Sequence, residues 1–216
     1  MDIAIPLFDR FTALDGIGPY ETLSRLPGAR VTFLAAEPGP VQTDNRMLSI
    51  VAERALGDMP NPDILVVPGG IGTRAMMNDT QLVDWVRTAH ETTQWTCSVC
   101  TGSLVLGAAG LLDGLEATTH WMAMETLAST GALPTGRRVV EQGKIITAAG
   151  VSSGIDMGLT LAAHIAGDKI AQAIQLGIEY DPQPPFDAGS PEKAPAEVVE
   201  ICRGVEALID AGQAVA

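Results

Sequence analysis

The sequence predicts an α/β domain whose mostly parallel β-sheet is wrapped by helices. Short, continuous apolar runs alternate along the chain with longer segments of helical periodicity. The runs lack the polar alternation of half-exposed strands, which is typical of parallel strands buried on both faces. A chain of 216 residues can also bury a large core without disulfides or metals. Stability therefore does not account for the cysteines.

Each expected strand is one of these apolar runs. Four strands and a short fifth are predicted at residues 3–8, 30–36, 64–67, 95–99 and 117–119. Residues 139–149 predict two further strands, because Gln142 and Gly143 form a turn between them. Ligands of such a sheet bind at the carboxyl ends of the parallel strands. A reactive side chain is therefore expected where a strand ends.

The remaining periodic segments predict helices. They lie at residues 18–26, 81–92, 101–109, 121–129, 152–166, 169–178 and 197–211. The segment 181–195 is rich in Pro, Gly and Asp, so it is expected to be irregular. Because no internal repeat or low-complexity linker divides the chain, residues 1–216 are expected to form a single domain.

The acidic charge restricts the partners of the chain. Its 26 acidic side chains against 13 basic ones give a net charge of −13, which repels nucleic-acid phosphates and anionic membranes. The expected substrate is therefore a small molecule. No signal peptide and no apolar stretch of membrane-spanning length is recognisable. Three sparse cysteines suit a reducing compartment, so a cytoplasmic location is expected.

Cys100 is the sharpest chemical signal in the sequence. It lies where the apolar strand 95–99 runs into a helix, with Ser98 and Gly102 two residues away on either side. Small residues there allow the strained turn that presents a nucleophile. Amides of the first helical turn are then expected to lower the pKa of the thiol. A buried, inert cysteine remains the alternative.

The other cysteines and the histidines predict neither a redox couple nor a metal site. Extended backbone from Cys97 to Cys100 spans roughly 10 Å, beyond the reach of a disulfide. Cys202 has no evident partner and is expected to be a packed helix residue. Since no set of His, Cys, Asp and Glu has metal-ligand spacing, no metal is expected.

Several residues are expected beside Cys100. Asp15 follows the first strand and is a candidate proton partner for the thiol, although helix capping is the commoner role. The amides of Gly70 and Ile71, after strand 64–67, predict a cradle for polar atoms. Further candidates for the pocket wall, with packing as the open alternative, are His120, Trp121 and Val151.

These motifs together resemble the DJ-1/PfpI superfamily over nearly the whole chain. Three segments are similar to its isocyanide hydratase branch, namely residues 98–112, 118–121 (Thr-Thr-His-Trp) and 179–191. The last, with its Pro-Pro-Phe and Gly-Ser-Pro, favours the hydratases over AraC-type regulators, which share the first two. Thr101 also matches the hydratase pattern, whereas the protease-like branch has a histidine after the cysteine.

The resemblance implies a flavodoxin-like three-layer sandwich, a homodimer and a cysteine nucleophile at Cys100 with Asp15 nearby. The implied reaction converts an apolar isocyanide and water into an N-substituted formamide, through a thioimidate on Cys100 and without a cofactor. Thr101 is expected to hydrogen-bond the thiol or the substrate nitrogen. Two alternatives stay open: a ligand-sensing, amidase-like domain related to AraC-type regulators, and a cysteine redox sensor of the DJ-1 type.

Overall fold

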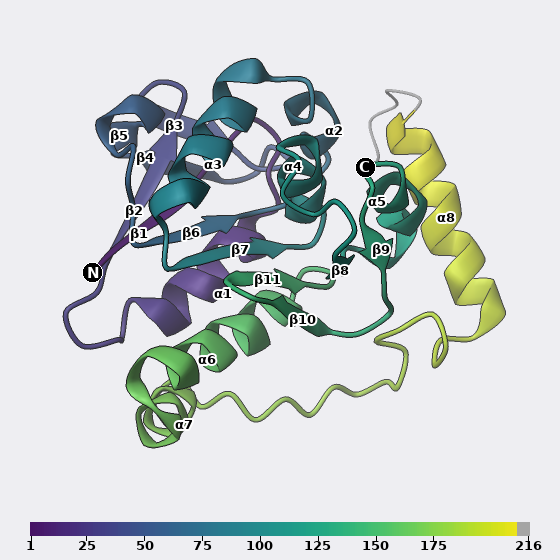
Figure 1. Ribbon diagram of the computed structural model, residues 1–216. Coiled ribbons are helices and arrows are strands. Elements are labelled where there is room, and N and C mark those ends of the chain that lie inside the picture. Colours follow the sequence, from purple (N-terminus) through teal and green to yellow (C-terminus); the bar gives the residue numbers. More distant parts are fainter. Residues whose placement is uncertain (211–216) are drawn as a thin grey trace. The chain divides into compact units, whose positions relative to one another are not determined.

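The computed structural model describes residues 1–210, which fall into two compact units, Met1–Glu179 and the segment from Tyr180 onward. The first unit contains a seven-stranded sheet of order β10-β11-β7-β6-β1-β2-β5 (Figure 1). Its strands are β1 (Asp2–Pro6), β2 (Arg30–Ala35), β5 (Arg54–Ala55), β6 (Ile64–Val67), β7 (Trp95–Val99), β10 (Val139–Gln142) and β11 (Ile145–Ala148). All neighbours pair in parallel except β10 and β11, which form an antiparallel edge.

The strand order confirms the predicted fold class. Taken in chain order, the strands β1, β2, β6, β7 and β11 lie in the spatial order 2-1-3-4-5, which is the flavodoxin-like arrangement. Helices cover both faces, with α1, α6 and α7 on one and α2, α3 and α4 on the other (Figure 1). Their bounds are α1 (Ala13–Leu23), α2 (Thr73–Met76), α3 (Thr80–Thr92), α4 (Gly102–Ala108), α6 (Ser153–Ala166) and α7 (Asp168–Gly177).

The buried central strands follow the sequence prediction closely. β6 and β7 have the predicted bounds, and every residue of β6 is buried. The predicted turn at residues 142–143 joins β10 to β11. The strand expected at 117–119 is instead β8 (Glu116–Ala117), which pairs with β9 (Leu133–Pro134) outside the main sheet. Beyond β8, the Thr118 N–H donates to Thr147 Oγ1 and the Thr119 hydroxyl donates to the Cys100 carbonyl, so these residues do not continue a strand ladder.

Helix α1 begins five residues before the predicted start at residue 18, so Asp15 lies in its first turn. Gly16, Gly18 and Pro19 weaken the helical signal in the sequence. Tertiary packing overrides that signal, because Gly18 lies against α6, where a Cβ would be 3.2 Å from Ile155 Cγ1. The predicted helix 121–129 is divided into a 3₁₀ turn, Trp121–Ala123, and α5, Met124–Ala128.

A hairpin, β3 (Gly39–Gln42) and β4 (Ser49–Ala52), was not predicted from the sequence, nor was the 3₁₀ turn Leu56–Asp58. The hairpin strands are short and mostly exposed, so they carry little hydrophobic signal. Thr12 anchors the hairpin end to α1, since its hydroxyl donates to Asp44 Oδ2 over 2.7 Å. The hairpin is thereby fixed next to the turn that precedes Asp15.

The second unit begins with irregular chain and continues as α8 (Ala196–Asp210). Residues 180–195 contain no helix or strand, as predicted. Of the predicted helix 197–211, Ala211 lies outside the described residues. That residues 1–216 form a single domain stays a prediction. No helix in the described part of the chain is both long and apolar enough to cross a bilayer.

Candidate active site

Cys100 occupies a strained turn between β7 and α4. Its φ of 56° lies in the left-handed region, which is uncommon for a residue with a side chain. The turn is held at both ends of the residue: the Cys100 N–H donates to the carbonyls of Ala148 and Ala149, each over 3.0 Å. The Cys100 carbonyl accepts from the hydroxyls of Thr119, over 3.0 Å, and Ser103, over 3.2 Å. The predicted nucleophile turn is thus present.

Two glycines allow the neighbouring backbones to approach this turn. A Cβ on Gly102 would overlap the Val67 carbonyl oxygen at the end of β6 and would lie 2.8 Å from that of Pro68. A Cβ on Gly69 would stand 2.6 Å from Thr101 Oγ1 and 2.8 Å from Asp15 Oδ2. The loop after β6 can therefore pack directly on the turn, and only glycine fits at these two positions.

Asp15 lies in the first turn of α1, where its fully buried side chain points toward the Cys100 turn. Its Oδ2 accepts the Gly69 N–H over 2.9 Å, and its Oδ1 has no hydrogen-bond partner among the described residues. Burial raises the pKa of Asp15 to about 8, and the charge of Asp44 adds to the rise. The Gly69 N–H and the Cys100 side chain oppose it, but do not outweigh the burial. The carboxyl group is therefore mostly protonated at neutral pH.

The predicted lowering of the Cys100 pKa is wrong. Burial raises the pKa of the thiol above its ordinary value, and a charge on Asp15 raises it further. The N–H groups of Val151 and Thr101 and the Thr101 hydroxyl stabilise the thiolate, but less than burial destabilises it. The resting pair is thus a neutral thiol beside a largely neutral carboxylic acid.

Thr101 links the cysteine turn to the glycine loop. Its Oγ1 accepts the Gly70 N–H over 2.9 Å, lies 3.2 Å from the Gly70 carbonyl oxygen, and is 3.0 Å from Thr73 Oγ1. The expectation of a free Gly70 amide is therefore wrong, because Thr101 already occupies that donor. Ile71 follows in the same loop and is partly buried.

Val151, His120 and Trp121 come together at the loop before α6. The Val151 N–H is placed to donate to Cys100, and the residue before it, Gly150, lies against the His120 ring. A Cβ on Gly150 would be 2.6 Å from His120 Cδ2. The rings of His120 and Trp121 are 5.8 Å apart. The structure thus brings the predicted wall residues to the loop that contacts the thiol.

Gly69 and Thr119 have supporting roles that were not predicted from the sequence. Gly69 fixes the Asp15 carboxyl, and Thr119 fixes the Cys100 carbonyl. Thr119 lies in the Thr-Thr-His-Trp motif and Gly69 directly precedes Gly70, yet only the fold reveals which polar group each one contacts. The position of each residue in or beside a recognised motif was the signal that the sequence offered for these roles.

The other two cysteines take no part in this cluster. Cys97 is fully buried within β7 and, like Cys100, is a free thiol, which agrees with the argument against a disulfide. Cys202 is exposed on α8, so the prediction of a packed residue is wrong. Among the described residues, no group of three or more His, Cys, Asp or Glu is arranged to hold a metal ion.

The geometry defines a class: a flavodoxin-like α/β protein with a cysteine at a strained strand-to-helix turn and a buried carboxyl group beside it. The DJ-1/PfpI family model matches residues 1–164. The chain belongs to the DJ-1/PfpI family.

Comparison with individual proteins shows how specific the similarity to this family is. The chain is 43% identical to isonitrile hydratase from Pseudomonas putida, over 94% of this chain and 89% of that protein. A crystal structure of a THiJ/PfpI family protein from Pseudomonas syringae superposes with a TM-score of 0.91 at 38% identity, over 97% of this chain and 86% of the other. The HTH-type transcriptional regulator CdhR from Pseudomonas aeruginosa is 35% identical over 78% of this chain, which spans 51% of the regulator. The chain is therefore a homologue of isonitrile hydratase over nearly its full length.

Proposed function

We propose that this protein is an isonitrile hydratase, a cysteine-dependent hydro-lyase that converts R–NC and water into an N-substituted formamide. The observation that carries the proposal is the buried pair of Cys100 and Asp15 at the strained turn. The similarity to an isonitrile hydratase over nearly the full length of both chains supports it. No cofactor is required, because every atom of the product comes from the isocyanide and water.

In the first step, sulfur attacks the terminal carbon of the isocyanide, and that carbon takes up a proton. The protonated Asp15 carboxyl donates this proton, and the thiol proton passes to the carboxylate left behind. The net change is addition of S–H to one carbon, which gives a thioimidate, R–N=CH–S–Cys100. Neutral reactants thus give a neutral intermediate, which suits a site whose burial disfavours both a thiolate and a carboxylate.

In the second step, water adds to the thioimidate carbon. Asp15 moves the protons between the incoming water and the substrate nitrogen. The tetrahedral adduct R–NH–CH(OH)–S–Cys100 then collapses: the C–S bond breaks, the hydroxyl becomes the formamide carbonyl, and its proton returns to sulfur. The N–H groups of Val151 and Thr101 stabilise negative charge as it develops on the departing sulfur.

The remaining site residues bind and orient the substrate. We assign the Thr101 hydroxyl to a hydrogen bond with the thiol or the substrate nitrogen. His120, Trp121 and Val151 form a wall against which an uncharged R group packs. Ile71 contributes its backbone amide, whereas Gly70 acts through its bond to Thr101.

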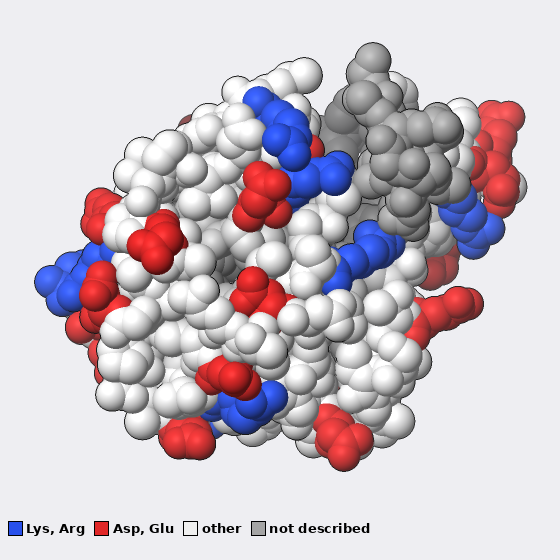
Figure 2. All heavy atoms as spheres, turned by 90° about the horizontal axis from the view of Figure 1, so that it is seen from above, with Lys and Arg blue, Asp and Glu red and all other residues white. Residues whose placement is uncertain are grey.

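We also propose a cytoplasmic homodimer. Met47, Leu48 and Val51, on the hairpin β3–β4, are 88%, 46% and 60% exposed, and apolar side chains gathered in this way are typical of interaction sites. Three free cysteines are compatible with a reducing compartment. The face shown in Figure 2 carries acidic side chains scattered over it. Light scattering of the protein as it elutes from a size-exclusion column measures the oligomeric state.

A second candidate, a ligand-sensing domain, is favoured by the similarity to the regulator CdhR. It predicts binding of a small molecule without turnover. The redox-sensor alternative is weakened by the raised pKa of Cys100, because the thiolate is the form that oxidises readily.

The deciding experiment combines turnover with detection of the intermediate. Purified protein is mixed with cyclohexyl isocyanide, and loss of the isocyanide infrared band is followed together with formation of N-cyclohexylformamide. Rapid acid quenching and mass spectrometry then test for an adduct on Cys100. Formamide production with a Cys100 adduct is expected. Binding without product favours the sensing domain, and product without any adduct on Cys100 contradicts covalent catalysis.

A further inference from the structure

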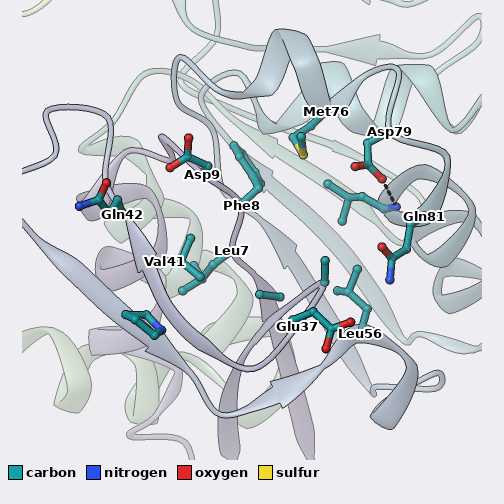
Figure 3. Close-up of a pocket in the computed structure, with 14 residues that line it drawn as sticks. Leu7, Phe8, Asp9, Glu37, Val41, Gln42, Leu56, Met76, Asp79 and Gln81 are labelled. Carbon is teal, nitrogen blue, oxygen red and sulfur yellow. Dashed lines mark hydrogen bonds between the residues drawn. The ribbon is translucent and has the colours of Figure 1, made fainter.

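A cavity of about 340 Å³ lies apart from Cys100, at the carboxyl ends of β1 and β2 (Figure 3). Its volume is at the lower end of the range for small-molecule sites. None of the residues assigned to catalysis or isocyanide binding lines it. The segment Phe8–Asp9 lines the cavity and packs against Gly72 of the glycine loop, where a Cβ would lie 3.2 Å from Phe8 Cδ2. The cavity is therefore separate from the Cys100 site, although Phe8 in its wall contacts the glycine loop.

The walls of the cavity are apolar, and its polar groups lie toward the ends. Leu7, Phe8 and Val41 lie between one end, with Asp9 and Gln42, and the other end, with Glu37 and Gln81 (Figure 3). Leu7 and Phe8 are 3% and 6% exposed, so they are part of the folded core rather than a mobile surface. Such a shape suits a ligand with an apolar body and a polar end group.

The charges determine the sign of that end group. Asp9, Glu37 and Asp79 all line the cavity, and none of the described residues that line it is basic. Two of the three carboxylates are already engaged: Asp79 Oδ1 accepts the Leu82 N–H over 2.9 Å as the N-cap of α3, and Asp9 pairs with Arg46 at 3.7 Å. Within the described residues, Glu37 has no ion pair or hydrogen bond through its side chain, so it is available to a ligand.

We infer that this cavity binds a small amphipathic organic cation, an alkylammonium or arylalkylammonium. The ammonium group is held at the Glu37 and Gln81 end, and the apolar chain lies along Leu7, Phe8 and Val41. An ammonium donates up to three hydrogen bonds, which the Glu37 carboxylate and the Gln81 carboxamide oxygen can accept. An anionic ligand would face the Glu37 carboxylate, and no basic side chain is among the described residues that line the cavity. This second site does not depend on the proposed hydratase activity.

The test compares three ligands of similar length: n-pentylammonium, n-pentanol and hexanoate. Methyl-labelled methionine gives an NMR signal for Met76, which lines the cavity, and Met76→Leu assigns that signal. We expect n-pentylammonium to shift the Met76 signal saturably, both in the wild-type protein and in Cys100→Ala, and to bind more tightly than the other two. Failure to shift this signal, or equal binding of n-pentanol, would overturn the inference.

The matched variants are Glu37→Gln and Glu91→Gln, which remove the same charge. Glu91 is an exposed residue near the far end of α3 and does not line the cavity. Glu37→Gln is expected to weaken n-pentylammonium binding by about threefold or more, while Glu91→Gln leaves it unchanged. Equal weakening by both variants would mean that only the overall charge attracts the cation, and the assigned site would then be wrong.

Discussion

Cys97 and Cys100 lie three residues apart, and burial raises the pKa of both thiols. Their surroundings differ in kind. Cys97 is inside β7 and is fully buried. Cys100 is beyond the end of the same strand, in left-handed backbone, and faces Asp15 together with the N–H groups of Val151 and Thr101. Burial is common to both, so it does not identify the reactive cysteine.

The difference lies in what converges on the sulfur. Asp15 from the first turn of α1 and the Val151 N–H from the loop before α6 act on the Cys100 sulfur directly. The loop after β6 acts through Asp15, which accepts the Gly69 N–H. A residue inside the strand is shielded from all of these. Position at the strand end therefore distinguishes the proposed nucleophile, Cys100, from the packed thiol of Cys97, as expected for open parallel sheets.

Among the changes that test this comparison, removal of the Cys100 sulfur is expected to have the largest effect on activity. Cys100→Ala is expected to lower formamide production by about 10⁴-fold or more, because no covalent intermediate can form. Product is measured by chromatography, and circular dichroism checks the fold. Cys202→Ala, at an exposed thiol, serves as the control and should retain full activity. Substantial turnover by Cys100→Ala would remove the basis of the comparison.

Asp15→Asn should produce two effects of opposite sign. Formamide production falls by about 10²- to 10⁴-fold because the proton donor is lost. Alkylation of Cys100 by iodoacetamide becomes faster at a given alkaline pH, because the charge that raised the thiol pKa is gone. Glu21→Gln, on an outer part of the same helix, is the matched control. Slower alkylation in Asp15→Asn would contradict the assigned electrostatics.

The raised pKa of Asp15 also makes a prediction for stability. Its folded value of about 8 exceeds the ordinary 3.8, so between these values the folded state holds a proton that the unfolded state releases. The stability contributed by this group is present at low pH and is lost as the pH rises toward the folded pKa. Relative to Asp15→Asn, the wild-type protein should lose up to about 1.4 kcal/mol of unfolding free energy per pH unit across this range.

Urea unfolding of both proteins at several pH values measures this difference. Subtracting the two curves removes the contributions of the other titrating groups. A difference that does not change with pH would mean that the Asp15 carboxyl titrates normally in the folded protein.

The smallest effect on formamide production is expected when Cys97 is replaced. Cys97→Ala removes a buried side chain from the core and should cost about 1 kcal/mol of stability, while turnover stays close to that of the wild-type protein. Thermal unfolding and the formamide assay measure the two quantities. A loss of activity comparable to that of Cys100→Ala would show that the two cysteines act together.

The sequence predicted those parts of the fold and site whose signals are local. The runs at Ile64–Val67 and Trp95–Val99 are continuous and apolar, so their bounds were correct. The turn at Cys100 was recognisable because small residues flank it. The start of α1 was missed because glycine favours irregular chain, and only the folded protein packs Gly16 against Ile5 and Phe33 and Gly18 against α6.

Other features depend on parts of the chain that are distant in sequence. The direction of the Cys100 pKa follows from how completely the surrounding loops exclude water, which no local pattern encodes. The cavity that Glu37 lines is formed by residues at the ends of β1 and β2, in the hairpin and at the start of α3. Their residues have ordinary helix, strand and loop patterns when each segment is taken alone.

The glycines at 69 and 102 have a consequence for protein engineering. Any side chain at Gly102 would collide with main-chain oxygens, and one at Gly69 would displace Asp15 and Thr101. Mutagenesis libraries that seek acceptance of bulkier isocyanides should therefore leave both codons fixed and randomise His120 and Trp121. Close packing of neighbouring backbone therefore restricts both positions beside Cys100 to glycine.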